Sequence, residues 1–371
     1  MDNIKIILVQ DERYKERIET CLKSPSVFIA PTNYCNFSCL YCSTKNTQKS
    51  KINIDLDFAK TIVDQCIENN WDFSFGQTYE PFLHPKISRL IRYVHENGKV
   101  FSSATNAMKI PADVFDLPMN LIISYSADEF DYRFRQSSLA YDLYQNKIVQ
   151  FVRHRIANTI PGLITLQIAD YSIFKGVFVY DKRIYEVEQI YQKSQKLLRQ
   201  LGLAGSVDDS EWRNNISQRR ALVLFESQCT KIQVEPTKIM PNTYEAFASM
   251  PLSYENRGYC DSCFTTMSIQ ADGEVAFCCC DPTAQVVAGA IDLKSNLRDF
   301  WLGREMSEIR NSFRMFAPKH SFCAQCLSNV SENIKPLLTV KDPALVAAIL
   351  ASHGIVDDLP WFSFPKPLVG I

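Results

Sequence analysis

Apolar positions recur along the first half of the chain with two different periods. Short apolar runs, typical of buried strands, are separated by longer segments in which apolar residues recur every three or four positions, as on one face of a helix. The predicted strands are 26–30, 72–75, 100–103, 120–125, 163–169 and 176–180. The predicted helices are 11–22, 56–69, 86–96, 111–115, 139–155 and 185–201.

This alternation of strands and helices predicts an α/β fold, because consecutive strands joined through helices run parallel in one sheet. The spacing fits a partial (β/α)6 barrel of parallel strands, followed by a smaller C-terminal α+β domain. Reactive side chains of such folds collect at the carboxyl ends of the strands. We therefore expect the catalytic and ligand-binding side chains directly after the strands.

The pattern of predicted elements changes near residue 229, where short strands, turns and cysteines replace the long helices. Asp272-Gly273 predicts a hairpin turn between strands 266–270 and 274–278, and a helix is expected over 296–314. The predicted domains are an N-terminal lead-in at 1–25, the barrel at 26–234, a second domain at 235–330 and a tail at 331–371.

Composition excludes several classes of protein. The 371 residues are 46% apolar and 22% charged, as in ordinary globular proteins, and 40 basic against 41 acidic residues give a net charge of −1. This balance predicts no general attraction for nucleic acid or for an anionic membrane. The chain has no apolar run near the ~20 residues that span a bilayer, and its start lacks a signal-peptide pattern, so we expect a cytoplasmic protein.

Thirteen cysteines are the unusual feature, and most stand in short clusters. In a reducing cytosol, clustered cysteines indicate metal or iron–sulfur ligation rather than disulfides. The first cluster, Cys35, Cys39 and Cys42, has the spacing C-x3-C-x2-C directly after the first predicted strand. Three thiolates from one loop suit a 4Fe–4S cluster with one open iron, whereas structural zinc needs a fourth ligand from elsewhere.

This arrangement, with the aromatic Tyr41 before its last cysteine, resembles the radical S-adenosylmethionine (radical SAM) superfamily. The resemblance implies that Cys35, Cys39 and Cys42 hold a 4Fe–4S cluster whose open iron chelates SAM. Reductive cleavage of SAM then gives a 5′-deoxyadenosyl radical that abstracts hydrogen from an unreactive C–H. Tyr41 is expected to contact the adenine.

Further segments resemble the family at the ends of later strands. The stretch 76–85 resembles the family's Gly-Gly-Glu-Pro motif, which implies that Glu80 meets the amino group of SAM, although Tyr79 stands where glycine is usual. The alternative is that Glu80 is a charge at a helix N-terminus. By the same resemblance, Asn106, Ser124 and Arg135 are expected at the cofactor; the alternative for Arg135 is a charge on a helix surface.

The C-terminal cysteines form Cys260-x2-Cys263, Cys278-Cys279-Cys280 and Cys323-x2-Cys326. Two C-x2-C pairs alone would also fit a zinc site. The whole pattern resembles the SPASM and twitch extensions of radical SAM enzymes, with spacing like that of radical SAM dehydrogenases acting on 2-deoxy-scyllo-inosamine. This resemblance implies one auxiliary 4Fe–4S cluster. Its expected ligands are Cys260, Cys278, Cys323 and Cys326. Cys263, Cys279 and Cys280 compete for the first two places.

The expected reaction is oxidation of a small hydroxylated substrate, a sugar or cyclitol, with the auxiliary cluster as electron acceptor. Epimerisation is the alternative, with Cys263 or Cys280 as the catalytic hydrogen donor; modification of a ribosomal peptide is another. An electron donor such as flavodoxin or ferredoxin is implied as a partner. A zinc-binding scaffold without catalysis is the alternative from another class.

Overall fold

The computed structural model describes residues 19–39, 42, 50–76, 78–170, 187–203, 208–217, 220–238, 262–278, 281, 284, 286–314, 320 and 323. The chain divides into two compact units, each assembled from separated segments. The first comprises residues 1–35, 46–103 and 252–334, and the second comprises residues 36–45, 104–251 and 335–371. The division falls inside strand β3 (Phe101–Thr105).

The strands of the first unit lie in the order β10-β9-β8-β1-β2-β3. Strand β1 pairs in parallel with β2 on one side and with β8 on the other, and β2 pairs in parallel with β3. Strands β8, β9 and β10 are antiparallel neighbours. Their bounds are β1 Ser26–Ile29, β2 Asp72–Phe75, β8 Thr266–Ile269, β9 Glu274–Ala276 and β10 Val287–Ala290.

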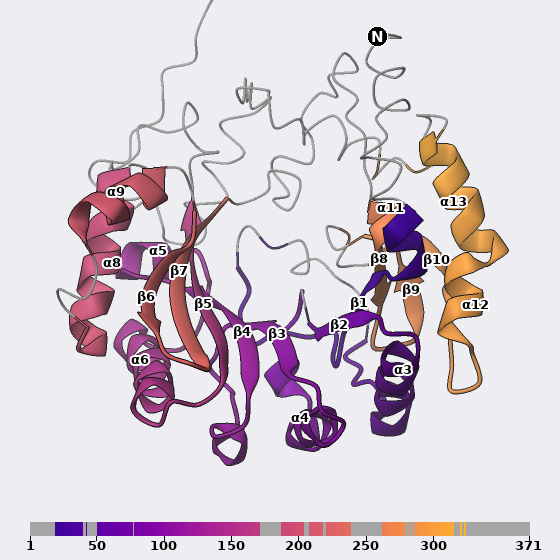
Figure 1. The fold of residues 1–371 in the computed structure, drawn as a ribbon, viewed down its shortest axis with the longest axis horizontal. Coiled ribbons are helices and arrows are strands. Elements are labelled where there is room, and N and C mark those ends of the chain that lie inside the picture. Colours follow the sequence, from indigo (N-terminus) through magenta and orange to yellow (C-terminus); the bar gives the residue numbers. More distant parts are fainter. Residues whose placement is uncertain are drawn as a thin grey trace, which may run out of the picture. The chain divides into compact units, whose positions relative to one another are not determined.

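Helices α3 (Leu56–Glu68) and α4 (Ile87–Glu96) connect these parallel strands. The side chain of Asp55 begins α3 by accepting hydrogen bonds from the backbone N–H groups of residues 57 and 58. The buried face of α3 consists of Leu56, Ala59, Ile62, Val63 and Cys66, and Phe58 is half-buried. In Figure 1, α3 lies below β1 and β2, and α12 and α13 lie beside β9 and β10.

The C-terminal segment of this unit forms the predicted hairpin. Gly273 has φ +86° in its turn, and a Cβ atom there would lie 2.4 Å from the carbonyl oxygen of Ile291, so only glycine fits. The helix expected over 296–314 is two helices, α12 (Leu297–Leu302) and α13 (Arg304–Arg314), because the chain turns at Gly303. A short helix, α11 (Ser262–Thr265), leads into β8.

The second unit is built on four strands in the order β4-β5-β7-β6. Strand β5 pairs in parallel with β4 and β7, and β6 pairs antiparallel with β7. Strand β5 enters at Gly162, whose φ of +131° and close approach to the carbonyl of Met119 exclude a side chain. The bounds are β4 Met119–Tyr125, β5 Gly162–Asp170, β6 Leu222–Glu226 and β7 Thr230–Lys238.

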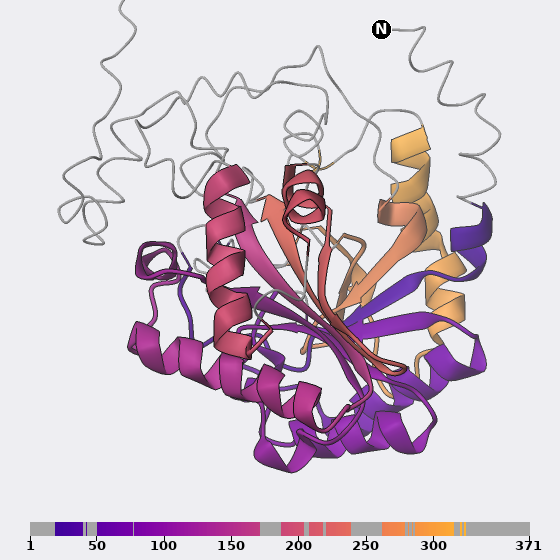
Figure 2. The same ribbon diagram turned by 60° about the vertical axis from the view of Figure 1, so that its left-hand side comes forward.

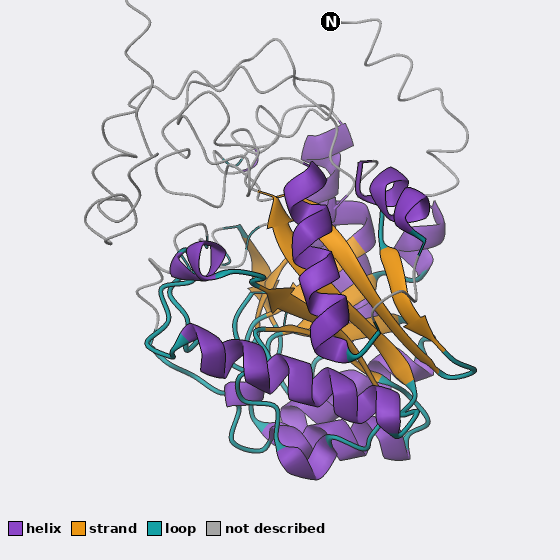
Figure 3. Ribbon diagram, turned by 90° about the vertical axis from the view of Figure 1, so that its left-hand side faces the viewer, coloured by secondary structure: helices purple, strands orange, loops and turns teal. Residues whose placement is uncertain are grey.

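Helices α6 and α8 pack together and cover one side of strands β5 and β7 (Figures 2 and 3). The ring of Trp212 on α9 is fully buried and meets Tyr191 on α8 edge to face, with ring centroids 5.7 Å apart. The helices are α5 Glu129–Arg133, α6 Tyr141–Ala157, α8 Val187–Leu201 and α9 Asp209–Ser217. Short 3-10 helices occupy Pro81–Leu83 (η2) in the first unit and Ala112–Val114 (η3) in the second.

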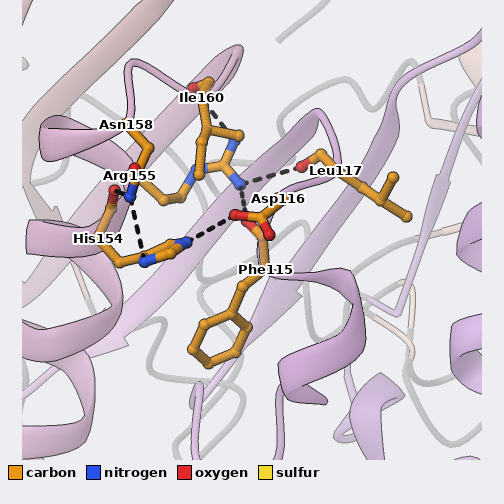
Figure 4. A network of polar contacts seen from close by, with 7 residues as sticks. All are labelled: Phe115, Asp116, Leu117, His154, Arg155, Asn158 and Ile160. Atoms are coloured by element: carbon orange, nitrogen blue, oxygen red, sulfur yellow. Dashed lines mark hydrogen bonds and ion pairs between the residues drawn. The ribbon is translucent and has the colours of Figure 1, made fainter.

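A fully buried arginine joins the segments that precede β4 and β5. The guanidinium of Arg155, on α6, donates to the carbonyl oxygens of Phe115 (3.2 Å), Leu117 (3.0 Å) and Ile160 (3.4 Å), as Figure 4 shows. It also donates to the carbonyl oxygen of Pro161 at 2.5 Å. Its neighbour His154 forms a hydrogen bond between Nε2 and the carboxylate of Asp116 at 2.7 Å. Burial lowers the pKa of Arg155 to about 10, which leaves the group charged at neutral pH.

The predicted elements within the described residues agree with the structure apart from the break at Gly303, but helices α5, α9 and α11 and strand β10 were not predicted. Strands 222–226 and 230–238 were not predicted, and the second takes the parallel place beside β5 and runs across the predicted boundary at 234. The expected strand 176–180 lies outside the described residues, as does most of the expected helix 11–22. No helix in the described part of the chain combines the length and apolar character needed to cross a membrane.

Candidate functional site

The first cysteine cluster lies after strand β1. Cys35 belongs to the first unit, and Cys39 and Cys42 belong to the second; all three are partly exposed. The backbone N–H of Cys42 donates to the carbonyl of Cys39 at 3.0 Å, a tight turn that keeps these two residues close in the chain. Tyr41 lies outside the described residues.

The three residues between Cys35 and Cys39 are fixed to elements of the second unit. Phe37 is 7% exposed and packs against the rings of Tyr132 and Tyr144, with both pairs of centroids 6.1 Å apart. The N–H of Ser38 donates to the carbonyl of Arg135 at 3.2 Å. Burial raises the pKa of the Tyr144 hydroxyl, which therefore stays protonated and donates to the carbonyl of Ser124.

Asn106 follows β3 and is buried. Its Nδ2 donates to Oδ1 of Asn36 at 2.9 Å, and its own Oδ1 accepts from the N–H of Met108 at 3.0 Å. Ala107 beside it has φ +63°, the left-handed conformation in which the N–H of Ala107 reaches Oγ1 of Thr105. The residue predicted at the cofactor thus contacts the cysteine loop directly.

Arg135 is 4% exposed, so the alternative of a charge on a helix surface is wrong. Its Nε donates to Oγ of Ser126 at 2.8 Å. Ser126 is fully buried and follows β4, whereas the predicted Ser124 is half-buried within β4. Sequence reasoning missed Ser126. The available signal was the strand period of two, which puts Ser124 and Ser126 on one face.

The turn after β2 contains Gly76 and Glu80. Gly76 has φ +59°, its N–H donates to the carbonyl of Ile29, and a Cβ atom there would lie 2.1 Å from Cγ of Pro81. Glu80 is 1% exposed, and its Oε1 accepts from the N–H of Phe82 at 3.2 Å at the start of η2. The helix N-terminal contact therefore exists, and cofactor contact by Glu80 stays a prediction.

His84 is a buried, neutral packing residue. Its Nδ1 accepts from the N–H of Lys86 at 3.1 Å, so Nε2 carries the proton and donates to the carbonyl of Ile54 at 2.9 Å. Burial is the main cause that lowers the pKa of His84 below its usual value, with Lys86 acting in the same direction. These two hydrogen bonds join the turn after β2 to the segment before α3.

We expect His84→Gln to remove part of the acid sensitivity of the fold. Because burial lowers the folded-state pKa, the unfolded chain takes up a proton near pH 6.5 while folded His84 does so only at lower pH. The wild type therefore loses stability as pH falls below about 6.5, by up to about 1.4 kcal/mol per pH unit. Urea unfolding at pH 7.5 and 5.5 measures this; an unchanged pH dependence in the variant would contradict it.

The second cluster is described in part. Cys263 on α11 is fully buried, and Cys278 after β9 and Cys323 are nearly so. The Asp281 carboxylate closes the turn after Cys278 by accepting from the N–H of Val286 at 2.7 Å. The remaining cysteines of the predicted auxiliary site lie outside the described residues: Cys260, Cys279, Cys280 and Cys326.

A buried arginine contacts this segment. Arg310 on α13 is 3% exposed; its Nε donates to the carbonyl of Cys263 at 3.0 Å, and its guanidinium lies 4.0 Å from the ring centre of Trp301. Trp301 is fully buried and donates from Nε1 to the carbonyl of Leu22. A fixed positive charge beside α11 suits a segment that carries thiolate ligands, and its role was not predicted.

The donor chemistry of both cysteine sets fits iron–sulfur clusters, which are held by thiolates. Within the residues that the structure describes, no three His, Cys, Asp or Glu side chains form a ready metal site. The ligand assignments made from the sequence therefore stay predictions.

Comparison with known proteins supports an iron–sulfur cluster in the C-terminal segment. The family model of the SPASM iron–sulfur cluster-binding domain matches residues 260–327. The structure of Streptococcus suis SuiB bound to precursor peptide SuiA is 15% identical, with a TM-score of 0.51 over 85% of this chain and 73% of SuiB. BtrN in complex with AdoMet and 2-DOIA is 12% identical, with a TM-score of 0.39 over 78% and 87% of the two chains.

At these values, the particular resemblance to an inosamine dehydrogenase is not established. None of the curated proteins compared with the chain gives a significant match. The predicted fold class is confirmed: the chain has a mixed α/β fold with a mostly parallel sheet, similar to the fold of SuiB, and its C-terminal segment matches the SPASM model.

Proposed function

We propose that this protein is a radical SAM enzyme with an auxiliary iron–sulfur cluster. The observation that carries the proposal is the C-x3-C-x2-C loop directly after β1, in a chain with the radical SAM fold and a SPASM match. When bound, the 4Fe–4S cluster and SAM supply the radical that removes hydrogen from a substrate C–H. The remaining tasks, which are binding, orientation and exclusion of water, fall to the chain itself.

In this proposal Cys35, Cys39 and Cys42 hold the SAM-binding cluster. Glu80 is the candidate partner for the amino group of SAM, because a carboxylate is a strong acceptor for an ammonium group. Arg135 complements the carboxylate of SAM, for which a guanidinium offers a planar fork of donors. Tyr41 contacts the adenine and Ser124 the ribose or carboxylate of SAM.

The auxiliary site is assigned to Cys260, Cys278, Cys323 and Cys326. The match of the SPASM model to 260–327 supports a cluster in this segment. The buried positions of Cys278 and Cys323 add support, because burial excludes the water and oxygen that degrade such clusters. Cys263 and Cys280 remain the candidate hydrogen donors for an epimerisation.

The first candidate reaction is oxidation of a hydroxyl-bearing sugar or cyclitol, in which the auxiliary cluster accepts an electron. A second candidate is modification of a peptide, and one observation favours it: the fold resembles that of SuiB, whose structure was determined bound to a precursor peptide. An electron donor such as flavodoxin or ferredoxin completes either reaction.

The test is release of 5′-deoxyadenosine from SAM by the anaerobically reconstituted full-length protein under dithionite. We expect brown protein with about eight iron atoms per chain, corresponding to two 4Fe–4S clusters, and SAM-dependent release of the nucleoside. With a candidate substrate in heavy water, deuterium incorporation indicates epimerisation, and a product two mass units lighter indicates oxidation. Colourless, zinc-containing protein that releases no 5′-deoxyadenosine would overturn the enzyme assignment in favour of the scaffold.

A further inference from the structure

The loop between Cys35 and Cys39 is held at three consecutive residues by three different elements of the second unit. Asn36 is bonded to the residue after β3, Phe37 is packed against rings of α5 and α6, and Ser38 is bonded to the carbonyl of Arg135 after α5. We call residues 36–38 the loop anchor. All of these contacts lie within one compact unit.

The orientation of the Asn106 amide is determined by its neighbours. Its oxygen must face the N–H of Met108, because only the oxygen accepts a hydrogen bond. Its nitrogen consequently faces Asn36, whose oxygen accepts at 2.9 Å. The amide pair therefore has a single polarity, with Asn106 as donor and Asn36 as acceptor.

The three contacts have different strengths. Burial of Phe37 makes the largest of the three contributions to the position of the loop, because it removes a whole aromatic ring from water. The Asn36 side chain is exposed, so burial cannot orient it, and the bond from buried Asn106 does so instead. The Ser38 bond then directs the backbone that leads into Cys39.

We propose that Asn106 is a positioning residue for the cysteine loop, acting through Asn36, and not primarily a ligand of the cofactor. The catalytic meaning of this inference rests on the proposed function, since the loop carries Cys39 and Cys42. The role of Asn106 in ordering the loop does not rest on the proposed function, because the hydrogen bond between Asn106 and Asn36 is present in the structure. The asparagine after β3 thus orders the backbone that carries the thiolates, through its bond to Asn36.

The test is hydrogen–deuterium exchange of the full-length chain, followed in the peptide that contains residues 36–42. We expect Asn36→Ala and Asn106→Ala each to raise exchange in this peptide by about fivefold, the factor equivalent to one net hydrogen bond. The double variant exchanges no faster than Asn106→Ala, because both changes remove the same bond between Asn36 and Asn106. Asn158→Ala, an exposed asparagine after α6, is the matched control and leaves the peptide unchanged.

A conservative variant separates positioning from general stability. Asn36→Asp keeps the acceptor oxygen, so it exchanges as slowly as the wild type, and the urea midpoints of both Asn36 variants stay close to that of the wild type because this side chain is exposed. Exchange in Asn106→Ala that equals the wild type, or additive effects in the double variant, would overturn the proposal. In those cases, weakened SAM binding by Asn106→Ala alone identifies a direct cofactor contact.

Failure of the proposed function gives a different result. If the reconstituted wild type releases no 5′-deoxyadenosine while the variants exchange as expected, the positioning role of Asn106 is supported and the radical SAM assignment is wrong. If the nucleoside is released but the variants show wild-type exchange, the radical SAM assignment is supported and the positioning role of Asn106 is wrong.

Discussion

Cys39→Ser is expected to abolish SAM cleavage while leaving the fold intact. A cluster held by only three thiolates has no spare protein ligand, and a serine oxygen is a poor substitute for a soft thiolate. Loss of a partner outside the first coordination sphere already costs a metal site about 10–100-fold, so loss of a ligand itself should lower 5′-deoxyadenosine release by more than about 100-fold. Iron content should fall by about four atoms per chain.

The matched control is Cys229→Ser, an exposed cysteine in the turn between β6 and β7 whose thiol contacts only neighbouring backbone and side-chain oxygens. It should keep full iron content and full nucleoside release. Release by Cys39→Ser at the wild-type rate would show that this thiol is not a cluster ligand. Cys39→Ser and Cys229→Ser should unfold at the same urea concentration as the wild type, because both side chains are at least partly exposed.

Arg155→Met is expected to be among the most destabilising single changes in the second unit. The methionine fills much of the same volume but removes the guanidinium donor from the carbonyls of Phe115 and Leu117. The carbonyls of Ile160 and Pro161 also lose it, but they keep the Thr230 hydroxyl and the N–H of Met119 as donors. A buried polar group that loses its partner costs about 1–3 kcal/mol, so the carbonyls of Phe115 and Leu117 account for most of the loss. We expect a loss of about 3–5 kcal/mol in the free energy of unfolding, measured with urea.

Two variants bracket this result. Arg153→Met changes an exposed arginine two residues away on the same helix, and it should cost less than about 0.5 kcal/mol. Arg155→Lys keeps the charge but cannot reach four carbonyls with one ammonium, so its loss should fall between the two. A loss below 1 kcal/mol for Arg155→Met would mean that the segments before β4 and β5 hold together without the guanidinium.

The strand and helix pattern could be predicted because it depends on short-range periodicity. Helix α3 begins at the predicted residue and buries Ile62, Val63 and Cys66, since apolar residues three and four apart share one side of a helix. The hairpin at Gly273 was predictable for a similar reason, as its left-handed backbone needs glycine. The break between α12 and α13 was missed because Gly303 interrupts an otherwise continuous helical period.

The polar contacts were not predictable, because they join residues that are distant in sequence. Nothing in the local pattern around Arg135 shows whether it faces water or Ser126, and the same holds for Arg310 and the carbonyl of Cys263. Strand β7 was missed because Pro236 and several polar residues interrupt its alternation. Its neighbour β5 supplies the pairing that the sequence alone does not reveal.

The pairing of β1 with β8 has a consequence for synthesis of the protein on the ribosome. Ser26–Ile29 emerges early, yet its partner on one side, Thr266–Ile269, is made about 240 residues later. At roughly 5–20 residues per second, this strand waits about 10–50 s with one row of backbone groups unsatisfied. The nascent chain should therefore depend on holdase chaperones during that interval, and any fragment ending before β8 should aggregate through the uncovered edge.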